Sequence, residues 1–303
     1  MRHYLSLVSL MGMLLLVNSA GAAWQPVTAE LIATEKPGYG KLCGVVVDHQ
    51  TGDVYVNLSD KGIYRSADQG KSWQRQGTET VKGRTEWPGC MQFDPTGKSK
   101  RLVLALVYGA PIAVSPDAGA HWKLMSPKSS HVDWCAVDWT DPAMAFVLAL
   151  KHESGDLLIA SHDGGKSFRE VGKGYGPSWI FDARTAVVAR ARSKAEPKPG
   201  LLRSTDGGKT FESCGAYTTR ALPKWHDGKL YWVVEEALIT SADKGRTWQK
   251  AGALKDGRFG PIFGKDAGHL FVLTGAGIVE SRDGGASWSK ALPLPQGVDA
   301  RGA

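Results

Sequence analysis

The stretch that decides the fold is Ser66-Ala67-Asp68-Gln69-Gly70-Lys71-Ser72-Trp73. It carries serine at position 1, aspartate at position 3, glycine at position 5 and an aromatic residue at position 8. The same pattern returns at 115–122, 161–168, 204–211, 241–248 and 281–288. With ordinary residue frequencies, four such fixed positions coincide at on the order of 10⁻⁵ of starting points. The chain is therefore built from a repeat, and we call each octapeptide a box.

The residue types in a box suit a tight hairpin turn. Serine and aspartate side chains exchange hydrogen bonds with the turn backbone, and glycine supplies a positive φ. The aromatic residue can pack between sheets. We therefore predict a structural role, and not a catalytic one, for the six box aspartates: Asp68, Asp117, Asp163, Asp206, Asp243 and Asp283.

The spacing of the boxes predicts the architecture. Their first residues are 49, 46, 43, 37 and 40 positions apart, and the mean of 43 is the length of one four-stranded propeller blade. Six boxes predict an all-β, six-bladed β-propeller. Seven blades are the alternative, because Trp24-Gln25-Pro26-Val27 resembles the strand that follows each box. We favour a segment that closes the ring by pairing with the last blade.

Position within a blade sorts residues between two faces. In the second repeat, alternation predicts strands over 90–94, 101–108, 112–115 and 122–125. The box is the turn between the third and fourth strands. The loops between the second and third strands, and between blades, must then lie on the opposite side, which we call the loop face.

The boxes resemble the BNR or Asp-box repeat of sialidase-like β-propellers, over essentially the whole mature chain. This resemblance implies a ligand site on the loop face. Sialidases carry Phe/Tyr-Arg-Ile-Pro at the first inner strand, where this chain has Lys41-Leu42-Cys43-Gly44-Val45. Their arginine triad and Tyr/Glu pair also find no residue-by-residue match, so sialidase activity is not expected. The blade sequences at 45–48, 53–56 and 62–65 also resemble the larger xyloglucanase and sortilin branches.

The first residues have the composition of an export signal. One basic group lies in Met1–His3, an apolar stretch covers Leu5–Val17, and Ala20-Gly21-Ala22 supplies an A-x-A cleavage pattern. We predict a signal peptide over 1–22, followed by a single propeller domain over 23–303. The mature protein would be periplasmic or extracellular. No later segment is long and apolar enough to span a membrane.

Composition excludes several classes of function. The net charge is +7, but the 37 basic residues are scattered, so nucleic acid is not the expected partner. The chain has no G-x-S-x-G elbow, P-loop or dinucleotide fingerprint. It also lacks the ligand spacings of zinc and EF-hand sites. We expect a monomer without cofactor or bound metal.

Cysteines occur at 43, 90, 135 and 214. Cys43, Cys90 and Cys135 begin the first strand of consecutive blades, which would bring them near the channel mouth. A disulfide between neighbours, Cys43 with Cys90 or Cys90 with Cys135, is the ordinary interpretation for an exported protein. The alternative is a three-thiolate site for a soft metal such as Cu(I), with His131.

The loop face collects aromatic and basic residues. Tryptophans recur at similar places in four successive blades, where their rings could stack on sugars. Arginines there could clamp a carboxylate or sulfate through paired hydrogen bonds. The alternative is that the tryptophans fill the space between blades and the arginines are solvated. The predicted ligand-binding residues are Arg84, Trp87, His131, Trp134, Trp179, Arg220, Trp225 and Arg258.

The function predicted from these features is ligand binding or scaffolding, with a glycan or protein partner on the loop face. The alternative is a glycoside hydrolase or polysaccharide lyase of the sialidase-like propeller type. Such a hydrolase needs two carboxylates across a cleft. Glu86 and Asp133, on adjacent loops of the loop face, are the predicted catalytic pair. The fold alone cannot decide between binding and catalysis.

Overall fold

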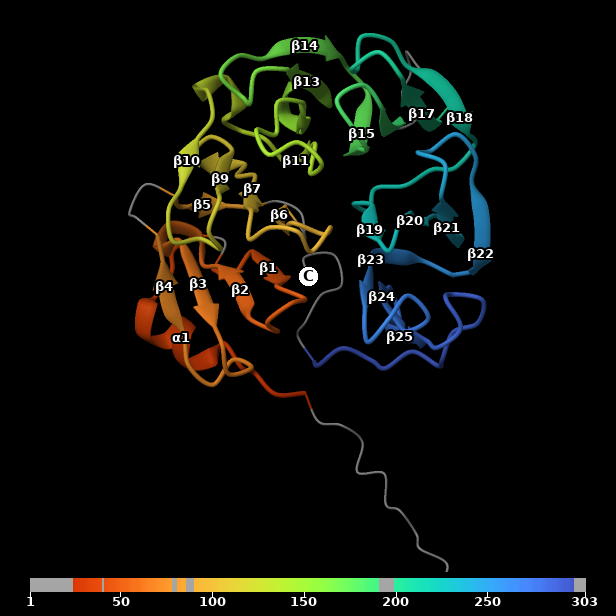
Figure 1. Cartoon of the computed structure of the whole chain (residues 1–303). Coiled ribbons are helices and arrows are strands. Elements are labelled where there is room, and N and C mark those ends of the chain that lie inside the picture. The colour runs from red at the N-terminus through yellow and green to blue at the C-terminus, as the bar shows by residue number, and fades with distance from the viewer. Residues whose placement is uncertain (1–23, 40, 78–80, 86–89, 191–198, 297–303) are drawn as a thin grey trace, which may run out of the picture.

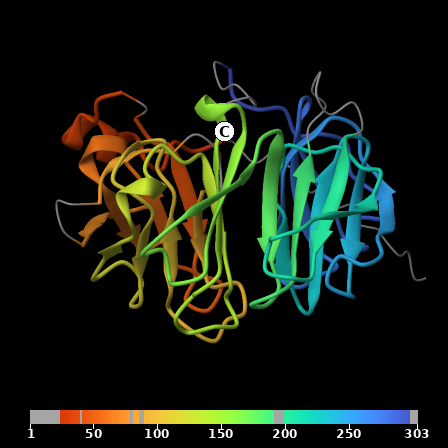
Figure 2. The same ribbon diagram turned by 90° about the horizontal axis from the view of Figure 1, so that it is seen from above.

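The computed structural model describes residues 24–39, 41–77, 81–85, 90–190 and 199–296. Over these residues six antiparallel sheets follow one another around a ring in chain order (Figure 1). The chain is therefore an all-β, six-bladed propeller, as the boxes predicted, and the seven-bladed alternative is wrong. Seen edge-on in Figure 2, the strands run between two loop-bearing ends, and α1 (Ala29–Glu35) lies at one of them.

Within each blade the strands are hydrogen-bonded in chain order. Blade 1 contains β1 (Gly44–Val47), β2 (Val54–Asn57), β3 (Ile63–Ser66) and β4 (Gln74–Gln76). Blade 2 contains β6 (Met91–Phe93), β7 (Leu102–Leu104), β9 (Ala113–Ser115) and β10 (Lys123–Leu124). Blade 3 contains β11 (Trp134–Val137), β12 (Val147–Lys151), β13 (Leu157–Ser161) and β14 (Arg169–Gly172). The strands of blade 2 lie inside the four ranges that the sequence predicted.

The second half of the ring repeats this plan. Blade 4 contains β15 (Tyr175–Ile180), β16 (Ala186–Arg190), β17 (Gly200–Ser204) and β18 (Glu212–Gly215). Blade 5 contains β19 (Lys224–His226), β20 (Lys229–Val234), β21 (Ala237–Ser241) and β22 (Gln249–Ala253). Blade 6 contains β23 (Gly257–Phe263), β24 (Leu270–Thr274) and β25 (Gly277–Ser281). A bridge between Ile278 and Leu292 marks the place of its fourth strand.

Short elements decorate the loop face. The ribbon of β5 (Gly83–Arg84) and β8 (Tyr108–Gly109) links the connection between blades 1 and 2 to the middle loop of blade 2. Three 3₁₀ turns are η1 (Ser59–Lys61), η2 (Pro127–Ser129) and η3 (His152–Ser154). Among the described residues no helix is long and apolar enough to cross a membrane.

Each box closes its hairpin with the same set of hydrogen bonds. In the first box, the Ser66 hydroxyl donates to Asp68 (2.8 Å) and accepts from the Gly70 amide (2.7 Å). The Asp68 carboxylate also accepts from the backbone amide and the hydroxyl of Ser72 (2.9 and 2.6 Å). These hydrogen bonds lower the pKa of Asp68 to about 2, and the bond from the Ser72 hydroxyl has the largest effect. In the second box a histidine, His121, takes the place of the hydroxyl.

The ring closes without the predicted extra strand. Residues 24–27 form no strand in the part of the chain that the structure describes. Instead, the Trp24 indole donates to the Pro293 carbonyl at 3.0 Å. The Trp73 indole of the first box donates to the Val27 carbonyl at 3.2 Å. The N-terminal segment therefore bridges blade 6 and blade 1 by side-chain contacts and not by strand pairing.

None of the four cysteines forms a disulfide in this structure. The Cys43 thiol contacts Asn57, and the Cys90 thiol donates to the Asp133 carbonyl at 2.6 Å. Burial raises the pKa of Cys135 to about 12, which keeps this thiol protonated. The structure thus differs from the expected disulfide between neighbours. The described residues also contain no cluster of three or more His, Cys, Asp or Glu side chains placed to hold a metal.

Candidate functional site

Aromatic and cationic side chains form a continuous row on the loop face. The guanidinium of Arg84 lies over the Tyr39 ring (4.6 Å to the centroid) and over the Tyr108 ring (5.1 Å). Tyr39 comes from the loop before β1, and the other two come from the β5–β8 ribbon. Tyr39 is 77% exposed and Tyr108 is 42% exposed. One cation thus contacts two large rings that lie at the surface.

The row continues into blade 3. The His131 ring meets the Tyr108 ring edge-on, with centroids 5.8 Å apart. The Tyr108 hydroxyl donates to the Glu153 carboxylate from η3, and His131 Nδ1 lies 3.7 Å from that carboxylate. We call Tyr39, Arg84, Tyr108 and His131 the aromatic row. It joins loops of three successive blades, all on the side away from the boxes.

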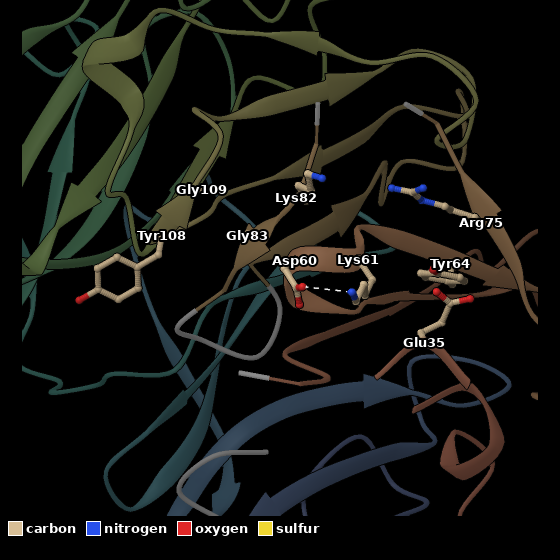
Figure 3. A pocket seen from close by; sticks show the side chains of 9 residues that line it. All are labelled: Glu35, Asp60, Lys61, Tyr64, Arg75, Lys82, Gly83, Tyr108 and Gly109. Atoms are coloured by element: carbon tan, nitrogen blue, oxygen red, sulfur yellow. Dashed lines mark ion pairs between the residues drawn. The ribbon is translucent and has the colours of Figure 1, made fainter. Parts of the chain in front are cut away.

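A pocket of about 630 Å³ adjoins the aromatic row between blades 1 and 2 (Figure 3). It shares Tyr108 with the row. The pocket is lined by Glu35, Asp60, Lys61, Tyr64, Arg75, Lys82, Gly83, Tyr108 and Gly109. Three of these side chains are cationic and two are carboxylates. We call this cavity the blade 1–2 pocket.

One carboxylate of the pocket is fixed by the protein's own groups. Asp60 accepts the Gly38 amide at 2.7 Å and the Ser59 hydroxyl at 3.0 Å, and it lies 3.4 Å from the Lys61 ammonium. The Gly38 hydrogen bond is the main cause that lowers the pKa of Asp60. Asp60 is thus a permanent anion that anchors the segment leading to Tyr39. It is not suited to act as a general acid.

One wall of the pocket consists of bare backbone. Gly83 and Gly109 have φ values of 150° and 138°, and they face each other across the β5–β8 ribbon. A Cβ at Gly83 would lie 2.1 Å from the Tyr108 carbonyl oxygen, and one at Gly109 would lie 2.3 Å from the Lys82 carbonyl oxygen. Only glycine permits this approach. The glycines therefore let the two strands of the ribbon approach each other closely, and this part of the pocket lining carries no side chain.

The predicted tryptophan platform is mostly used inside the fold. Trp134 is fully buried in β11, and Trp179 is buried in β15. Trp225 is partly buried and stacks on Trp179, with ring centroids 6.2 Å apart and planes 9° apart. These tryptophans fill the space between blades, which was the alternative that the sequence left open. Trp87 lies outside the described residues.

Of the predicted catalytic pair, Asp133 lies in the described part of the chain. Asp133 is fully buried, and its carboxylate accepts the His152 backbone amide at 2.7 Å and contacts the His152 ring nitrogen. A carboxylate enclosed in this way holds η3 in place and does not face a cleft. Glu86 lies outside the described residues.

The predicted arginines do not gather into one clamp. Arg84 belongs to the aromatic row, whereas Arg220 and Arg258 are exposed on the far side of the ring, before β19 and within β23. Arg258 pairs with Asp256 at 2.9 Å. Of the predicted ligand-binding residues, Arg84 and His131 both contact Tyr108 in the aromatic row, whereas Trp179 and Trp225 meet inside the fold.

Sequence reasoning placed Tyr39 and Tyr108 on the loop face without singling them out. It missed Glu35, Arg75 and Lys82 altogether. Arg75 and Lys82 follow the first box, on the outer strand β4 and just before β5, and Glu35 ends α1. The sequence signal that could have indicated this site is the pair Gly83 and Gly109, which stand next to Lys82, Arg84 and Tyr108. Their pairing across the ribbon joins two loops that are distant in sequence.

No protein-family model matches the sequence, and no curated protein matches it. Solved structures do match the fold. PorZ, a surface component of the type-IX secretion system of Porphyromonas gingivalis, is 13% identical with a TM-score of 0.56, over 84% of this chain and 32% of PorZ. YCF48 from Cyanidioschyzon merolae is 12% identical with a TM-score of 0.47, over 84% and 86% of the two chains. A GH74 xyloglucanase from Xanthomonas campestris is 16% identical with a TM-score of 0.40, over 84% and 52%.

The chain thus spans about a third of PorZ and about half of the xyloglucanase. At these identities the likeness concerns the propeller fold alone. The activity of this chain has to be argued from its own residues.

Proposed function

We propose that this chain is an exported, monomeric binding protein whose loop face holds an extended segment of a partner polypeptide. The observation that carries the proposal is the aromatic row, in which Arg84 contacts the exposed rings of Tyr39 and Tyr108. Exposed tyrosine and arginine side chains are typical anchors of protein interfaces. The predicted signal peptide over 1–22 belongs to this proposal.

Two features favour a polypeptide over a glycan. Sugar rings need accessible aromatic faces, but Trp134 and Trp179 are buried, and Arg84 lies over a face of Tyr108. The pocket lining at Gly83 and Gly109 has no side chain, so it presents backbone beside the row. Successive groups of the row are about 5 Å apart, and an extended chain advances about 3.3 Å per residue, so about four or five residues would cover it.

Selection from a phage-displayed random peptide library tests this proposal. We expect wild-type protein to enrich peptides that lose at least about tenfold in affinity for the Tyr39→Ala and Tyr108→Ala variants. Lys209→Ala, an exposed change in the fourth box, is the matched control and should bind as wild type. Absence of enrichment, or equal binding to the tyrosine variants, would contradict the proposal.

A second candidate, a glycosidase, is favoured by one contact. The Tyr108 phenol donates to the Glu153 carboxylate on the loop face. In this candidate Glu153 takes the phenol proton as the Tyr108 oxygen bonds to the anomeric carbon, the glycosidic bond breaks, and the proton passes to the leaving oxygen. Water activated by Glu153 then hydrolyses the glycosyl-enzyme and returns the proton to Tyr108. Mass spectrometry of neutral, uronic, sulfated and sialylated oligosaccharides after incubation is the test. This candidate predicts a new product that disappears in Tyr108→Phe, and no product from the panel would remove it.

A further inference from the structure

Two basic side chains of the inner strand β19 face blade 6. Side chains alternate along a strand, so Lys224 and His226 lie on one face of β19 and Trp225 lies on the other. The contacts agree, because Trp225 stacks on blade 4 whereas the His226 ring stacks on Phe263 of blade 6, with centroids 4.1 Å apart. The Lys224 ammonium lies 5.2 Å from the centre of the Phe259 ring, also in blade 6. Lys224 and His226 therefore share one surface, with about 7 Å between their positions along the strand.

Groups from the opposite side of the ring come close to these two residues. Figure 1 shows β19 and β23 on one side of the propeller axis, and β1 and β6 on the other. His49 lies in the turn after β1. Burial is the main cause that lowers the pKa of His49, and the nearby His226 and Lys224 lower it further. Cys90, just before β6, also interacts electrostatically with Lys224. We call Lys224, His226 and His49 the axial basic cluster.

No carboxylate of the described residues forms an ion pair with the axial basic cluster. Asp48, next to His49, is buried and accepts the Gln50 amide (2.9 Å) and the Thr51 hydroxyl (3.1 Å) of its own turn. Burial lowers the pKa of Lys224 to about 8, as expected for an ammonium group without a carboxylate beside it. At pH 7 Lys224 is therefore still a cation, and no described ion pair balances its charge.

The axial basic cluster is accessible to solvent. Lys224 and His226 are partly buried, and His49 is exposed. The turn with His49 joins the first and second strands of blade 1, so it lies on the same side of the propeller as the boxes. A small solute can therefore reach the cluster from the side away from the aromatic row.

We infer that the axial basic cluster binds an anionic oxygen group, phosphate or carboxylate, of a small ligand. The Lys224 ammonium would give it a charge-assisted hydrogen bond, and the ring nitrogens of His226 and His49 supply further donors. Phe259 and Phe263 keep water from one side, which strengthens the attraction between the ammonium and the anion. The anion in turn replaces the hydration that Lys224 has lost on burial. This site does not use the aromatic row and is independent of the proposed function.

Inorganic phosphate and acetate are the probes, each titrated at pH 7 with the ionic strength held constant by chloride. Backbone amide shifts in the nuclear magnetic resonance spectrum measure both the affinity and the place of binding. We expect wild-type protein to bind at least one of the two anions with a Kd of about 10 mM or lower. The shifts should centre on β19, β23 and the turn that carries His49.

Two substitutions test the cluster itself. Lys224→Met keeps most of the side-chain length without the charge, and it should weaken anion binding about tenfold or more. His226→Phe keeps a ring against Phe263 without the ring nitrogens, and it should weaken binding about threefold. Lys250→Met is the matched control, because it makes the same change on an exposed residue of β22, the outermost strand of blade 5. It should bind as wild type.

Saturable binding that is lost in Lys224→Met and kept in Lys250→Met supports the inference. Absence of saturable shifts with both anions would overturn it, as would equal affinities of Lys224→Met and wild type. An equal loss in Lys250→Met would also overturn it, because the effect would then come from overall charge. Peptide selection by the aromatic row depends on other residues, so its result stands separately from all of these outcomes.

Discussion

At the scale of single residues, Lys224 has an unusual environment for a charged group. It begins β19 on the inner side of blade 5, and its ammonium lies 5.2 Å from the centre of the Phe259 ring. Among the residues that the structure describes, it has no ion pair with a carboxylate. Burial lowers its pKa from 10.5 to about 8. A cation–π contact replaces only part of the lost hydration.

The Lys224→Met variant should therefore be more stable than wild type at neutral pH, by about 2–3 kcal/mol. The folded pKa lies below the unfolded one, so below pH 8 both states are protonated and the full cost of the partly buried charge is present. That cost disappears as the pH rises from about 8 to 10.5. Denaturant unfolding at pH 7 and at pH 10 measures this change.

Lys229→Met, an exposed change on the partner strand β20, is the control and should leave stability unchanged. A stability gain for Lys224→Met that is equally large at pH 7 and pH 10 would show that packing, and not charge, is responsible. A loss of stability at pH 7 would contradict the argument.

At the scale of elements, β11 shows why a loop-face tryptophan became a core residue. All four of its residues, Trp134–Val137, are buried, because this inner strand packs against β15 of the next blade as well as pairing with β12. Trp134 contributes one of the largest fully buried side chains. Its ring therefore stabilises the interface between blades.

We expect Trp134→Ala to lower the free energy of unfolding by about 3–5 kcal/mol, because it leaves a large cavity. Tyr39→Ala, on the exposed aromatic row, should change it by no more than about 0.5 kcal/mol. Denaturant unfolding followed by circular dichroism compares the two. Equal effects would mean that Tyr39 is a structural residue and would remove the main support for the aromatic row as a binding surface.

The repeated boxes were enough to predict the fold, but they did not predict the candidate site. Each box carries its own local hydrogen bonds, as between Ser66, Asp68 and Gly70, so eight residues suffice to predict a hairpin. The contacts of Tyr108 with Arg84 and Glu153 join loops from different blades. Such pairings depend on how adjacent blades are rotated, which residue spacing does not reveal. Likewise, strand alternation did not show that Trp134 faces a neighbouring blade.

At the scale of the whole molecule, the ring has one seam, between the last and first blades. Neighbouring blades elsewhere meet through packed strands, as in β1 with β6, β11 with β15 and β20 with β23. At the seam, the described contacts include the Trp24–Pro293 and Trp73–Val27 hydrogen bonds. Val27 also lies against Gly70, where a Cβ would come within 2.8 Å of its side chain. The N-terminal segment, through Trp24 and Val27, therefore connects blades 6 and 1.

Removing the Trp24 and Val27 side chains should increase local opening in blades 6 and 1 more than in the other blades. In a Trp24→Ala, Val27→Ala double variant, we expect amide hydrogen exchange to rise about tenfold in β1–β4 and β23–β25, because the seam opens more often. Exchange in blades 3 and 4, inside the main core, should stay near the wild-type rate. Ala33→Gly, a small exposed change in α1, is a control for general effects of altering the N-terminal region. Unchanged exchange at the seam would show that other contacts hold the ring closed, and a uniform rise around the ring would show that the propeller opens as one cooperative unit.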